Sequence, residues 1–515
     1  MGTALASIAA CLVLAWLYKV INWVWVKPKR LETCLRHQGL KGNSYRFLYG
    51  DTKDNLKMIL DASSKPILLS DDIAPRVDPY LNLCLRTYGK NFIMWMGPKP
   101  RVNVMDPELI KDVFNKINDF QKPAVNPLVA LLTKGFAIHN GDKWAKHRKL
   151  INPVFHSEKL KSMMPAFYHS SNDMVSKWEK LTLDSADGSC ELDVWPDLQN
   201  LTRNVIARTA FGSSYEEGKR IFELQTELSG LVMQALVSVY IPGWRFVPTK
   251  MNRRMKALER EIKASLRFII NKKEEALKEG KAASDDLLGL LLESNLKEMK
   301  EHKNKKDVGM SLDEVIEECK LFYFAGQEST SAMLVWTMIL LSQHQEWQRR
   351  ARDEVLQVFG TEKPYLEGLN HLKVVTMILH EALRLYPPGI LVNRETRKET
   401  VLGNLTLPAG VMVSVPILSI QRDPDIWGED ANEFKPERFS QGVFNATKGQ
   451  VTFLPFTWGP RICIGQNFSL LEGKMAVALV LKTFTFELSP SYTHAPYNVI
   501  SLQPQHGAHL ILHKF

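Results

Sequence analysis

One short stretch of the chain combines residue types that can hold a metal ion. Cys463 lies between Gly459 and Gly465, two residues after Arg461, and an apolar helical pattern runs from Phe468 to Phe484. Because this places the thiol near a helix N-terminus, backbone N–H groups and the helix dipole are expected to stabilise its thiolate. The glycines allow the backbone to turn tightly beside a flat, bulky group. Such a thiolate can be an axial ligand of haem iron; an ordinary buried cysteine is the alternative for this residue alone.

A second group of polar residues interrupts a long apolar helix. Ser311 and Glu314 predict a capping box at its start, and the helical pattern continues beyond Leu341. Residues 325–331 read Ala-Gly-Gln-Glu-Ser-Thr-Ser. This sequence favours a distorted helix, because glycine costs about 1 kcal/mol relative to alanine and hydroxyl side chains bond back to the backbone. A loop between two shorter helices is the alternative, but the apolar pattern stays in phase, and broken local rules often mark functional sites.

Two further pairs place charged or aromatic side chains at helical spacing. Glu381 and Arg384 are three residues apart with apolar neighbours, so the pair is expected to be buried and to need a further partner, for which Arg438 is the candidate. Trp144 and Arg148 are four residues apart and share one helical face. For that second pair alone, an exposed tryptophan beside a solvated arginine is the favoured alternative.

The elements that position these residues begin with an apolar N-terminal segment. Residues 4–26 are long enough to cross a bilayer and carry tryptophan and tyrosine suited to its interface. Lys27, Lys29 and Arg30 follow, and the positive-inside rule keeps them in the cytosol. A cleaved signal peptide is the alternative, but no small-residue cleavage pattern follows the apolar run.

The domain prediction follows from this anchor. Pro28 is expected to end the helix and to begin a stiff hinge. We therefore expect a membrane anchor over residues 1–26, a basic hinge over 27–44 and one cytosolic catalytic domain over 45–515. Helical patterns dominate that domain, with short strands expected within residues 401–416 and 508–513. The predicted fold class is mostly α with a small β region.

Composition narrows the class of protein. The chain has 515 residues, 45% of them hydrophobic, which is ample for a large core. It carries 66 Lys and Arg against 56 Asp and Glu, a net charge of +10. No basic run interleaves with aromatic residues as nucleic-acid binding would require, so an anionic membrane or an acidic partner accounts better for the charge. The six cysteines include no Cys-x-x-Cys pair, so neither a zinc site nor a disulfide framework is indicated.

The motifs together resemble those of the cytochromes P-450. The Trp-x-x-x-Arg pair, the 325–331 stretch, the Glu-x-x-Arg pair and Phe-x-x-Gly-x-Arg-x-Cys-x-Gly at Phe456–Gly465 occur in the family's usual order and span most of the chain. The resemblance implies the P-450 fold, a haem b cofactor and the use of O2. Two positions depart from the family pattern: Ser329 stands where threonine is usual, and Thr457 where glycine is usual.

The resemblance also implies roles for single residues in cofactor binding. Cys463 would be the axial ligand of the haem iron. The side chains implied as contacts of the haem propionates are Trp144, Arg148, Arg394 and Arg461.

Catalysis and structure are assigned in the same way. Glu328 and Ser329 would deliver protons to bound oxygen, and Gly326 would leave room for that oxygen. The residues implied as a purely structural network beside the haem loop are Glu381, Arg384 and Arg438.

Two surfaces are expected around this site. The apolar substrate wall, which predicts an apolar substrate, would comprise residues 123–136, Phe324, Ala325, Ile390 and Leu391. A reductase is expected to dock on a basic face formed by Lys143, Lys146, His147 and Lys149. A solvated helix face without a partner is the alternative for that basic face.

Finer motifs are similar to those of the plant 72 clan, the subgroup that contains secologanin synthase and triterpenoid oxidases. They lie at residues 25–30, 240–244, 322–328 and 427–430. This resemblance implies a single-pass enzyme of the endoplasmic-reticulum membrane that oxidises terpenoids with O2 and with electrons from NADPH through a reductase.

Two other functions remain open at this point. A haem-thiolate isomerase or lyase needs neither O2 nor a reductase, but it also needs no proton-delivery residues such as Glu328 and Ser329. A non-catalytic haem sensor would normally carry an added signalling domain, and no spare segment is apparent.

Overall fold

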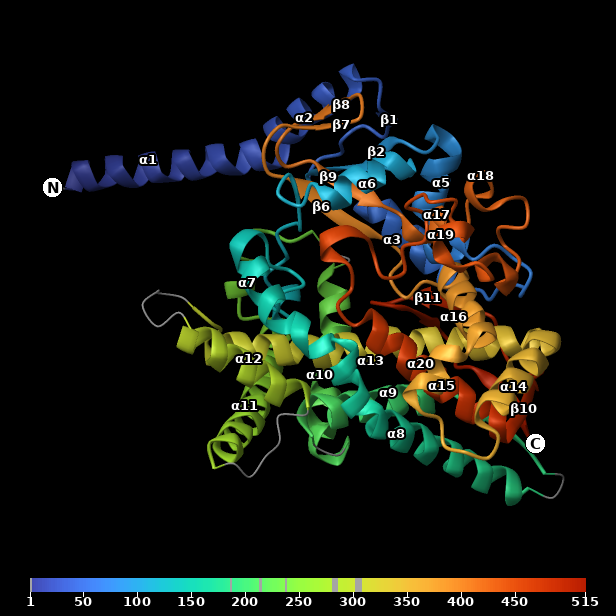
Figure 1. Ribbon diagram of the computed structural model, residues 1–515. Coiled ribbons are helices and arrows are strands. Elements are labelled where there is room, and N and C mark those ends of the chain that lie inside the picture. Colours follow the sequence, from blue (N-terminus) through green and yellow to red (C-terminus); the bar gives the residue numbers. More distant parts are fainter. Residues whose placement is uncertain (1, 186–187, 213–214, 237–238, 280–285, 302–307) are drawn as a thin grey trace.

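The computed structural model describes the whole chain except residues 1, 186–187, 213–214, 237–238, 280–285 and 302–307. Long helices form most of the body, and a smaller region of sheets lies beside them (Figure 1). The predicted fold class, mostly α with a small β region, is confirmed by this arrangement.

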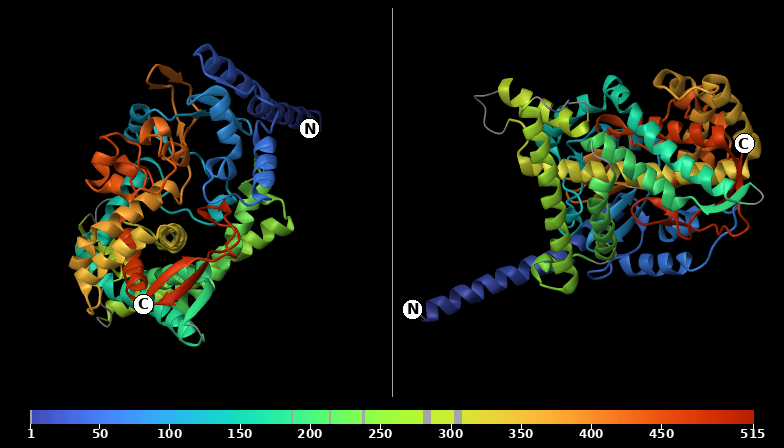
Figure 2. Two further views of the ribbon diagram at one scale, coloured as in Figure 1. Left: turned by 90° about the vertical axis from the view of Figure 1, so that its right-hand side faces the viewer. Right: turned by 90° about the horizontal axis from the view of Figure 1, so that it is seen from below.

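The N-terminal helix projects away from the body (Figures 1 and 2). It runs as α1 (Gly2–Ile21), a π-helical turn (Asn22–Val26) and α2 (Lys27–His37). Within the described residues one helical segment, Ser7–His37, is long and apolar enough to cross a membrane, and only 6% of its apolar window is buried. These features fit a membrane anchor.

The prediction that Pro28 ends this helix is wrong. Pro28 lies in the first turn of α2, where its missing N–H is tolerated. The π-helical turn before it shifts the hydrogen-bond pattern. The hydroxyl of Tyr45 donates to the carbonyl of Val24 over 2.5 Å, which is the carbonyl that the N–H of residue 28 would otherwise reach. The helix therefore continues to His37, into the predicted hinge.

The helical body is built around α13 (Leu312–Gln343). Figure 2 shows this helix end-on with other helices and strands around it, and most of its side chains are buried. Ser311 and Glu314 form the predicted capping box. The helix is continuous through residues 325–331, so the alternative of two helices joined by a loop is wrong. The helices that carry the site and its support are α7 (Gly141–Ile151), α8 (Ser157–Leu183), α9 (Trp195–Phe211), α16 (Lys373–Leu385) and α20 (Gln466–Thr483).

The remaining helices complete the layers around this core. They are α3 (Thr52–Ser63), α4 (Ala74–Val77), α5 (Pro79–Tyr88), α6 (Pro107–Asn115), α10 (Tyr215–Leu236), α11 (Lys250–Lys278), α12 (Leu287–Glu301), α14 (Gln345–Phe359), α15 (Leu366–His371), α17 (Ile417–Ile420), α18 (Pro424–Trp427) and α19 (Gly442–Ala446).

The largest sheet has six strands in the order β1-β2-β3-β9-β6-β4. These strands are β1 (Lys41–Gly42), β2 (Phe92–Met96), β3 (Lys99–Asn103), β9 (Met412–Val415), β6 (Val392–Thr396) and β4 (Phe120–Gln121). β6 and β9 pair antiparallel, with Arg394 opposite Val413. This sheet brings the segment after α16 next to the segment before α7.

Three smaller sheets contain the other described strands. The first has the order β10-β13-β5, and the other two are the hairpins β11-β12 and β7-β8. Their strands are β5 (Ser189–Asp193), β7 (Thr400–Leu402), β8 (Leu405–Leu407), β10 (Phe484–Leu488), β11 (Pro496–Asn498), β12 (Leu502–Pro504) and β13 (His509–Lys514). The predictions of strands within residues 401–416 and 508–513 are thus confirmed.

Candidate functional site

The loop that carries Cys463 links a short 3₁₀ turn, Gly459–Arg461, to α20. Cys463 lies three residues before the first residue of α20, and its N–H donates to the carbonyl of Phe456 over 2.9 Å. The side chain keeps accessible surface, although it lies deep among other residues of the protein. The thiol is therefore available to a ligand inside the molecule.

The electrostatic prediction for this thiol is only partly correct. The Gly465 N–H and the Arg148 charge act to lower the pKa of Cys463, but burial acts more strongly and raises it. In the protein by itself, desolvation of the thiolate therefore outweighs the helix N-terminus. A coordinated metal ion changes this balance, because it deprotonates a thiol ligand outright.

Backbone conformation explains the residue types in the loop. Gly459 has φ +75°, and a Cβ there would come within 3.1 Å of the Phe114 carbonyl. Thr457 has φ +61°, a left-handed conformation that is unusual for a β-branched residue, and its Oγ1 donates to the Arg461 carbonyl over 3.2 Å. Gly465 has an ordinary φ of −87°, and nothing lies within 4 Å of the position of a Cβ. That open side of Gly465 can accept a flat group.

The structure brings Trp144, Arg148 and Arg461 together beside this loop. Arg148 Nη1 donates to the Ile462 carbonyl over 2.9 Å, next to Cys463. The Arg461 guanidinium stacks 4.5 Å from the centre of the Trp144 ring, and its Nη1 donates to the His139 carbonyl over 2.9 Å. The exposed-tryptophan alternative is therefore not supported.

Arg394 and Lys122 add two cations to this group. Arg394, on β6, is 1% exposed, and its Nε has no hydrogen-bond partner among the described residues. Burial and the neighbouring Arg461 lower the pKa of Arg394 to about 10. Burial together with Arg394 and Arg461 lowers the pKa of Lys122 to about 7. Lys122 was not predicted from the sequence, because nothing local to it distinguishes it from a surface lysine.

These cations lack acidic partners of their own. Within the described part of the chain, no carboxylate opposes the lowered pKa values of Lys122, Arg394 and Arg461. Like charges held together in a low dielectric require an anionic complement. The donor set therefore fits a flat group that carries carboxylates at one edge and a metal ion that the Cys463 sulfur can bind, which is the description of haem.

The helix α7 is fixed to α13 by a buried histidine. His147 Nδ1 and Glu318 Oε1 are 2.6 Å apart, and both side chains are fully buried. The Phe136 N–H also donates to both oxygens of Glu318, over 2.8 and 2.9 Å. This contact sets the position of α7 and hence of Trp144 and Arg148, the residues on either side of it in sequence.

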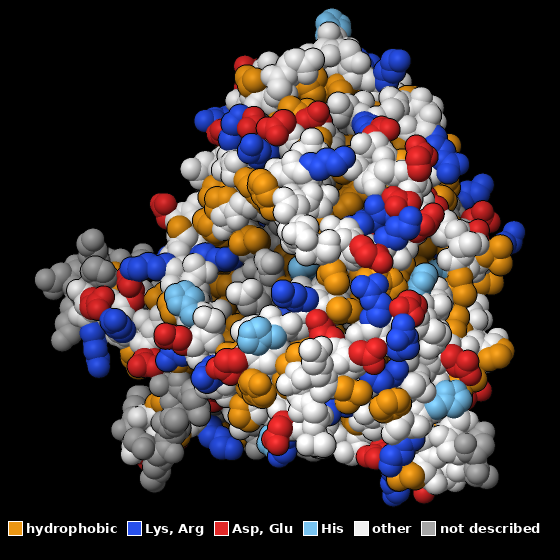
Figure 3. Space-filling model, turned by 45° about the vertical axis from the view of Figure 1, so that its right-hand side comes forward, with side chains coloured by type: hydrophobic (Ala, Val, Ile, Leu, Met, Phe, Trp, Pro, Cys, Tyr) orange, Lys and Arg blue, Asp and Glu red, His pale blue; other side chains and the backbone are white. Residues whose placement is uncertain are grey.

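The predicted basic docking face must be corrected accordingly. His147 points into the core and cannot contact a partner. Lys143 is paired with Glu314 at 2.8 Å and Lys149 with Glu298 at 2.8 Å, so acidic residues neutralise part of the face. On the side of the molecule shown in Figure 3, basic and acidic side chains are likewise interspersed.

The middle of α13 carries two accessible residues. Ala325 and Ser329 are four residues apart and exposed on a helix that is otherwise largely buried. Ser329 Oγ donates to the Ala325 carbonyl over 3.0 Å, which is the back-bonding that loosens a helix. One residue further, Thr330 Oγ1 donates to Ser469 Oγ on α20 over 3.1 Å. This turn of α13 therefore lies next to the start of α20, the helix that follows Cys463.

Glu328 and Gly326, on the same turn of α13, contact other parts of the chain. Glu328 Oε1 accepts a hydrogen bond from Ser501 Oγ over 2.8 Å, and no hydrogen bond joins Glu328 to Ser329 among the described residues. Burial raises the pKa of Glu328, while Ser501 and the charge of Arg203 oppose that rise. A Cβ on Gly326 would lie 2.8 Å from Ile206 Cδ1 on α9. The missing side chain of Gly326 thus permits the close contact of two helices, and its role in leaving room for oxygen stays a prediction.

The expected wall residues differ in accessibility. Phe324 is partly buried and Ala325 is exposed, as a wall requires, and Leu391 is half-buried. Ile390 is 8% exposed and packs in the main core. Leu128, Leu132 and Phe136 of the expected 123–136 segment also belong to that core.

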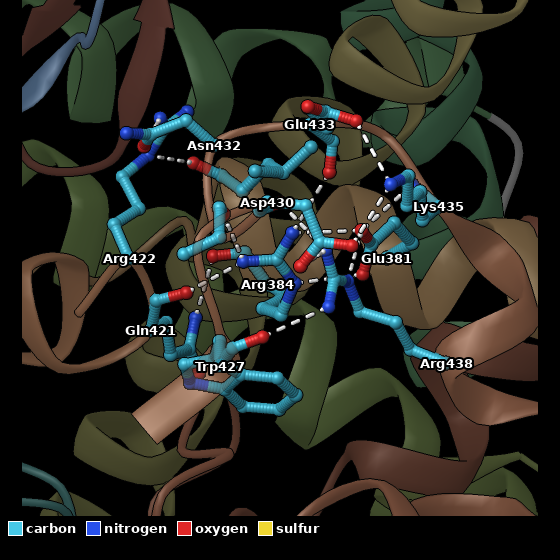
Figure 4. Close-up of polar contacts among 12 residues, drawn as sticks. Glu381, Arg384, Gln421, Arg422, Trp427, Asp430, Asn432, Glu433, Lys435 and Arg438 are labelled. Carbon is cyan, nitrogen blue, oxygen red and sulfur yellow. Dashed lines mark hydrogen bonds and ion pairs between the residues drawn. The ribbon is translucent and has the colours of Figure 1, made fainter. Parts of the chain in front are cut away.

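Glu381, Arg384 and Arg438 form one network of polar contacts (Figure 4). Arg384 Nε and Nη2 each donate to Glu381 over 2.7 Å, and both side chains are fully buried. Arg384 Nη1 donates to the carbonyls of Gln421 and Ala431 over 2.7 and 2.6 Å. Arg438 Nε lies 3.4 Å from Glu381 Oε1. The network ties α16 to the segment between α17 and the Cys463 loop.

Comparisons with known proteins agree with this geometry. Residues 74–510 match the family described as "Cytochrome P450". The chain is 60% identical over 97% of its length to "Cytochrome P450 72A397" of Kalopanax septemlobus, covering 95% of that protein. It is 57% identical to "Cytochrome P450 72A15" of Arabidopsis thaliana, with the whole of both chains covered. Among solved structures, "Retinoic acid bound cyanobacterial CYP120A1" shares the fold with a TM-score of 0.73 and 24% identity, over 85% of this chain and 94% of that one.

Proposed function

The chain belongs to the cytochrome P450 family of haem monooxygenases, and we propose that it inserts one oxygen atom from O2 into a terpenoid of plant metabolism. NADPH supplies two electrons through a separate reductase, and the second oxygen atom leaves as water. The observation that carries this proposal is the accessible thiol of Cys463 in its motif, beside cations for which the described residues supply no acidic partner. When bound, haem supplies an iron centre that activates O2.

The residues of the chain bind and orient that cofactor. Cys463 is the proposed iron ligand, and Lys122, Arg394 and Arg461 neutralise the carboxylates of the haem edge. Trp144 stacks on Arg461 and fixes its direction. Arg148 holds the Cys463 loop through the Ile462 carbonyl.

Proton delivery is assigned to this turn of α13. Ser329 carries an exposed hydroxyl that donates to the Ala325 carbonyl; by rotating, it can instead donate its hydrogen bond to a group bound beside the helix. Glu328 is an ionisable group within the same helix turn, and burial raises its pKa, which makes it a candidate to hold and release a proton. Because serine lacks the methyl group that restricts threonine at χ1, we expect the Ser329 hydroxyl to be less fixed than a threonine hydroxyl.

The substrate class and the cellular location are inferred from the finer motifs and from the N-terminal helix. The resemblance of residues 25–30, 240–244, 322–328 and 427–430 to the plant 72 clan supports a terpenoid substrate and the endoplasmic-reticulum membrane. The helix within Ser7–His37 supports a single membrane span with the catalytic domain in the cytosol.

The test is product formation under isotopically labelled O2. Membranes that contain the protein and a plant reductase are incubated with NADPH and a panel of small terpenoids. We expect a product that carries one labelled oxygen atom and depends on NADPH. Product that forms equally well without O2 would instead indicate an isomerase or lyase. The Cys463→Ala variant, prepared in the same membranes, controls for other enzymes.

A further inference from the structure

The carboxyl of Glu328 is held by a residue that is distant in the sequence. Ser501 Oγ donates to Glu328 Oε1 over 2.8 Å, across 173 positions of the chain. Ser501 is 3% exposed and ends the turn between β11 and β12. This hydrogen bond from a buried residue holds Glu328 Oε1 in place.

The turn that carries Ser501 is itself fixed on two sides. The N–H of Leu502 donates to the Pro388 carbonyl over 2.9 Å. The Leu502 carbonyl accepts from Trp336 Nε1, on α13, over 2.8 Å. Trp336 also stacks on Tyr386 with ring centres 4.3 Å apart. Ser501 therefore keeps its place relative to α13, and its hydrogen bond to Glu328 is preorganised.

The opposite side of Glu328 faces α9. Thr202 Oγ1 donates to the Gln327 carbonyl over 3.2 Å, which fixes α9 against this turn of α13. Arg203 follows Thr202, and its charge attracts the Glu328 carboxylate. No hydrogen bond between Arg203 and Glu328 is present among the described residues, so Ser501 alone sets the orientation.

We propose that Ser501 is a positioning residue for proton delivery, holding Glu328 Oε1 so that Oε2 can exchange a proton with water. Each proton that Glu328 gives up is replaced from water, and the Ser501 hydroxyl keeps its own proton throughout. The proposal rests on the proton-delivery role proposed above for Glu328. It makes the β11–β12 turn part of the catalytic apparatus, although the turn need not touch the cofactor.

The first readout is spectroscopic and needs no turnover. The infrared carbonyl band of the protonated Glu328 carboxyl is identified by its loss in Glu328→Gln. We expect this band to shift in Ser501→Ala, because one hydrogen bond to the carboxyl is removed, and to stay in place in Ser501→Thr, which keeps a hydroxyl. Ser342→Ala is the matched control, since Ser342 is a buried serine of α13 whose Oγ donates, among the residues that the structure describes, to the Ile339 carbonyl alone, over 2.7 Å.

The second readout is product formed per NADPH consumed, measured on the membrane-bound holoenzyme. We expect Ser501→Ala to lower the rate of coupled product formation about tenfold, equivalent to about 1.4 kcal/mol, with Ser501→Thr and Ser342→Ala near the native value. In the Glu328→Gln background, Ser501→Ala should cause no further loss, because both changes act on the same group.

The outcomes separate this proposal from the function on which it rests. If Glu328→Gln leaves coupling unchanged, the proton-delivery role of Glu328 is wrong. If Glu328→Gln impairs coupling while Ser501→Ala changes neither the infrared band nor the coupling, only the role of Ser501 is overturned. Additive losses in the double variant also overturn it. Should Ser501→Ala fail to bind haem, Ser501→Cys decides by the same readouts. Cysteine keeps the shape of the serine side chain, but its S–H is only a weak hydrogen-bond donor.

Discussion

Replacing the buried Arg384 by lysine should lower the free energy of unfolding far more than replacing an exposed arginine by lysine. Arginine has five N–H donors in a fixed fork, and lysine has three donors on a flexible stem. Arg384 uses every one of its donors: two reach Glu381, and the others reach the carbonyls of Gln421, Ala431 and Glu433. Lysine therefore leaves at least two of these acceptors without a partner.

The magnitude follows from that count. A buried acceptor that loses its partner costs about 1–3 kcal/mol, so Arg384→Lys should lower the free energy of unfolding by roughly 2–6 kcal/mol. Domains of this kind have only about 5–15 kcal/mol in total. Much of the variant should therefore be unfolded or unable to retain haem, although it keeps the positive charge beside Glu381.

Arg349→Lys is the matched control. Arg349 and Glu346 are also three residues apart on a helix and 2.8 Å apart, but each side chain is 62% exposed. Exposed pairs contribute at most about 1 kcal/mol, so this change should have little effect. The assay is urea unfolding followed by tryptophan fluorescence, together with the haem content per protein. Equal midpoints for Arg384→Lys and Arg349→Lys would refute the argument that the full set of hydrogen bonds stabilises the fold.

Three further predictions concern the candidate site. Thr457→Gly relieves a left-handed conformation that costs about 1–2 kcal/mol but loses the bond to Arg461, so its urea midpoint should stay near the native one. Thr457→Ala keeps the strain and should lower the unfolding free energy by about 1 kcal/mol; an alanine variant as stable as the glycine variant would contradict the strain. Lys122→Met should weaken haem retention. Because the pKa of Lys122 falls from 10.5 to about 7 on folding, the unfolded chain binds more protons between these values. The haem-free native protein should therefore gain stability as pH rises through that window, and Lys122→Met should flatten this rise; an unchanged slope would count against the cation cluster. His147→Ala removes the partner of buried Glu318 and should lower the unfolding free energy by about 2 kcal/mol, whereas Lys149→Ala should have little effect; similar urea midpoints for the two variants would show that His147 does not fix α7.

The features that could be predicted from the sequence are those that depend on residues close together in the chain. The capping box of Ser311 and Glu314 is confirmed because both members lie within one helical turn. The fold class and the strands within residues 401–416 follow from hydrophobic periodicity and turn residues. The contact between Glu381 and Arg384 follows from their spacing on one helical face.

The features that were missed depend on partners far apart in the chain. Pro28 does not end its helix because Tyr45 supplies a hydrogen bond to Val24, and no local pattern shows that. His147 lies in a basic stretch of sequence, yet it is buried because its ring pairs with Glu318 on another helix. Lys122 acquires its significance only when folding brings Arg394 and Arg461 beside it.

Glycine positions illustrate the same limit. Gly326 is assigned to oxygen binding from its place in a motif, and the absent Cβ also accommodates Ile206 on α9. The sequence shows that a residue is small, and only the packed structure shows which neighbour requires it. The partner of Glu328 was missed for this reason as well, since Ser501 follows it by 173 residues.

The most direct test of the account is the spectrum of the reduced protein with carbon monoxide, recorded for the native chain and for Cys463→Ala. The site predicts a thiolate-type absorption band for the native protein, because the Cys463 sulfur is the proposed axial ligand of the haem iron. It predicts complete loss of that band in the variant, together with all product formation. A variant that keeps the native band would show that another group binds the iron and would contradict the central claim.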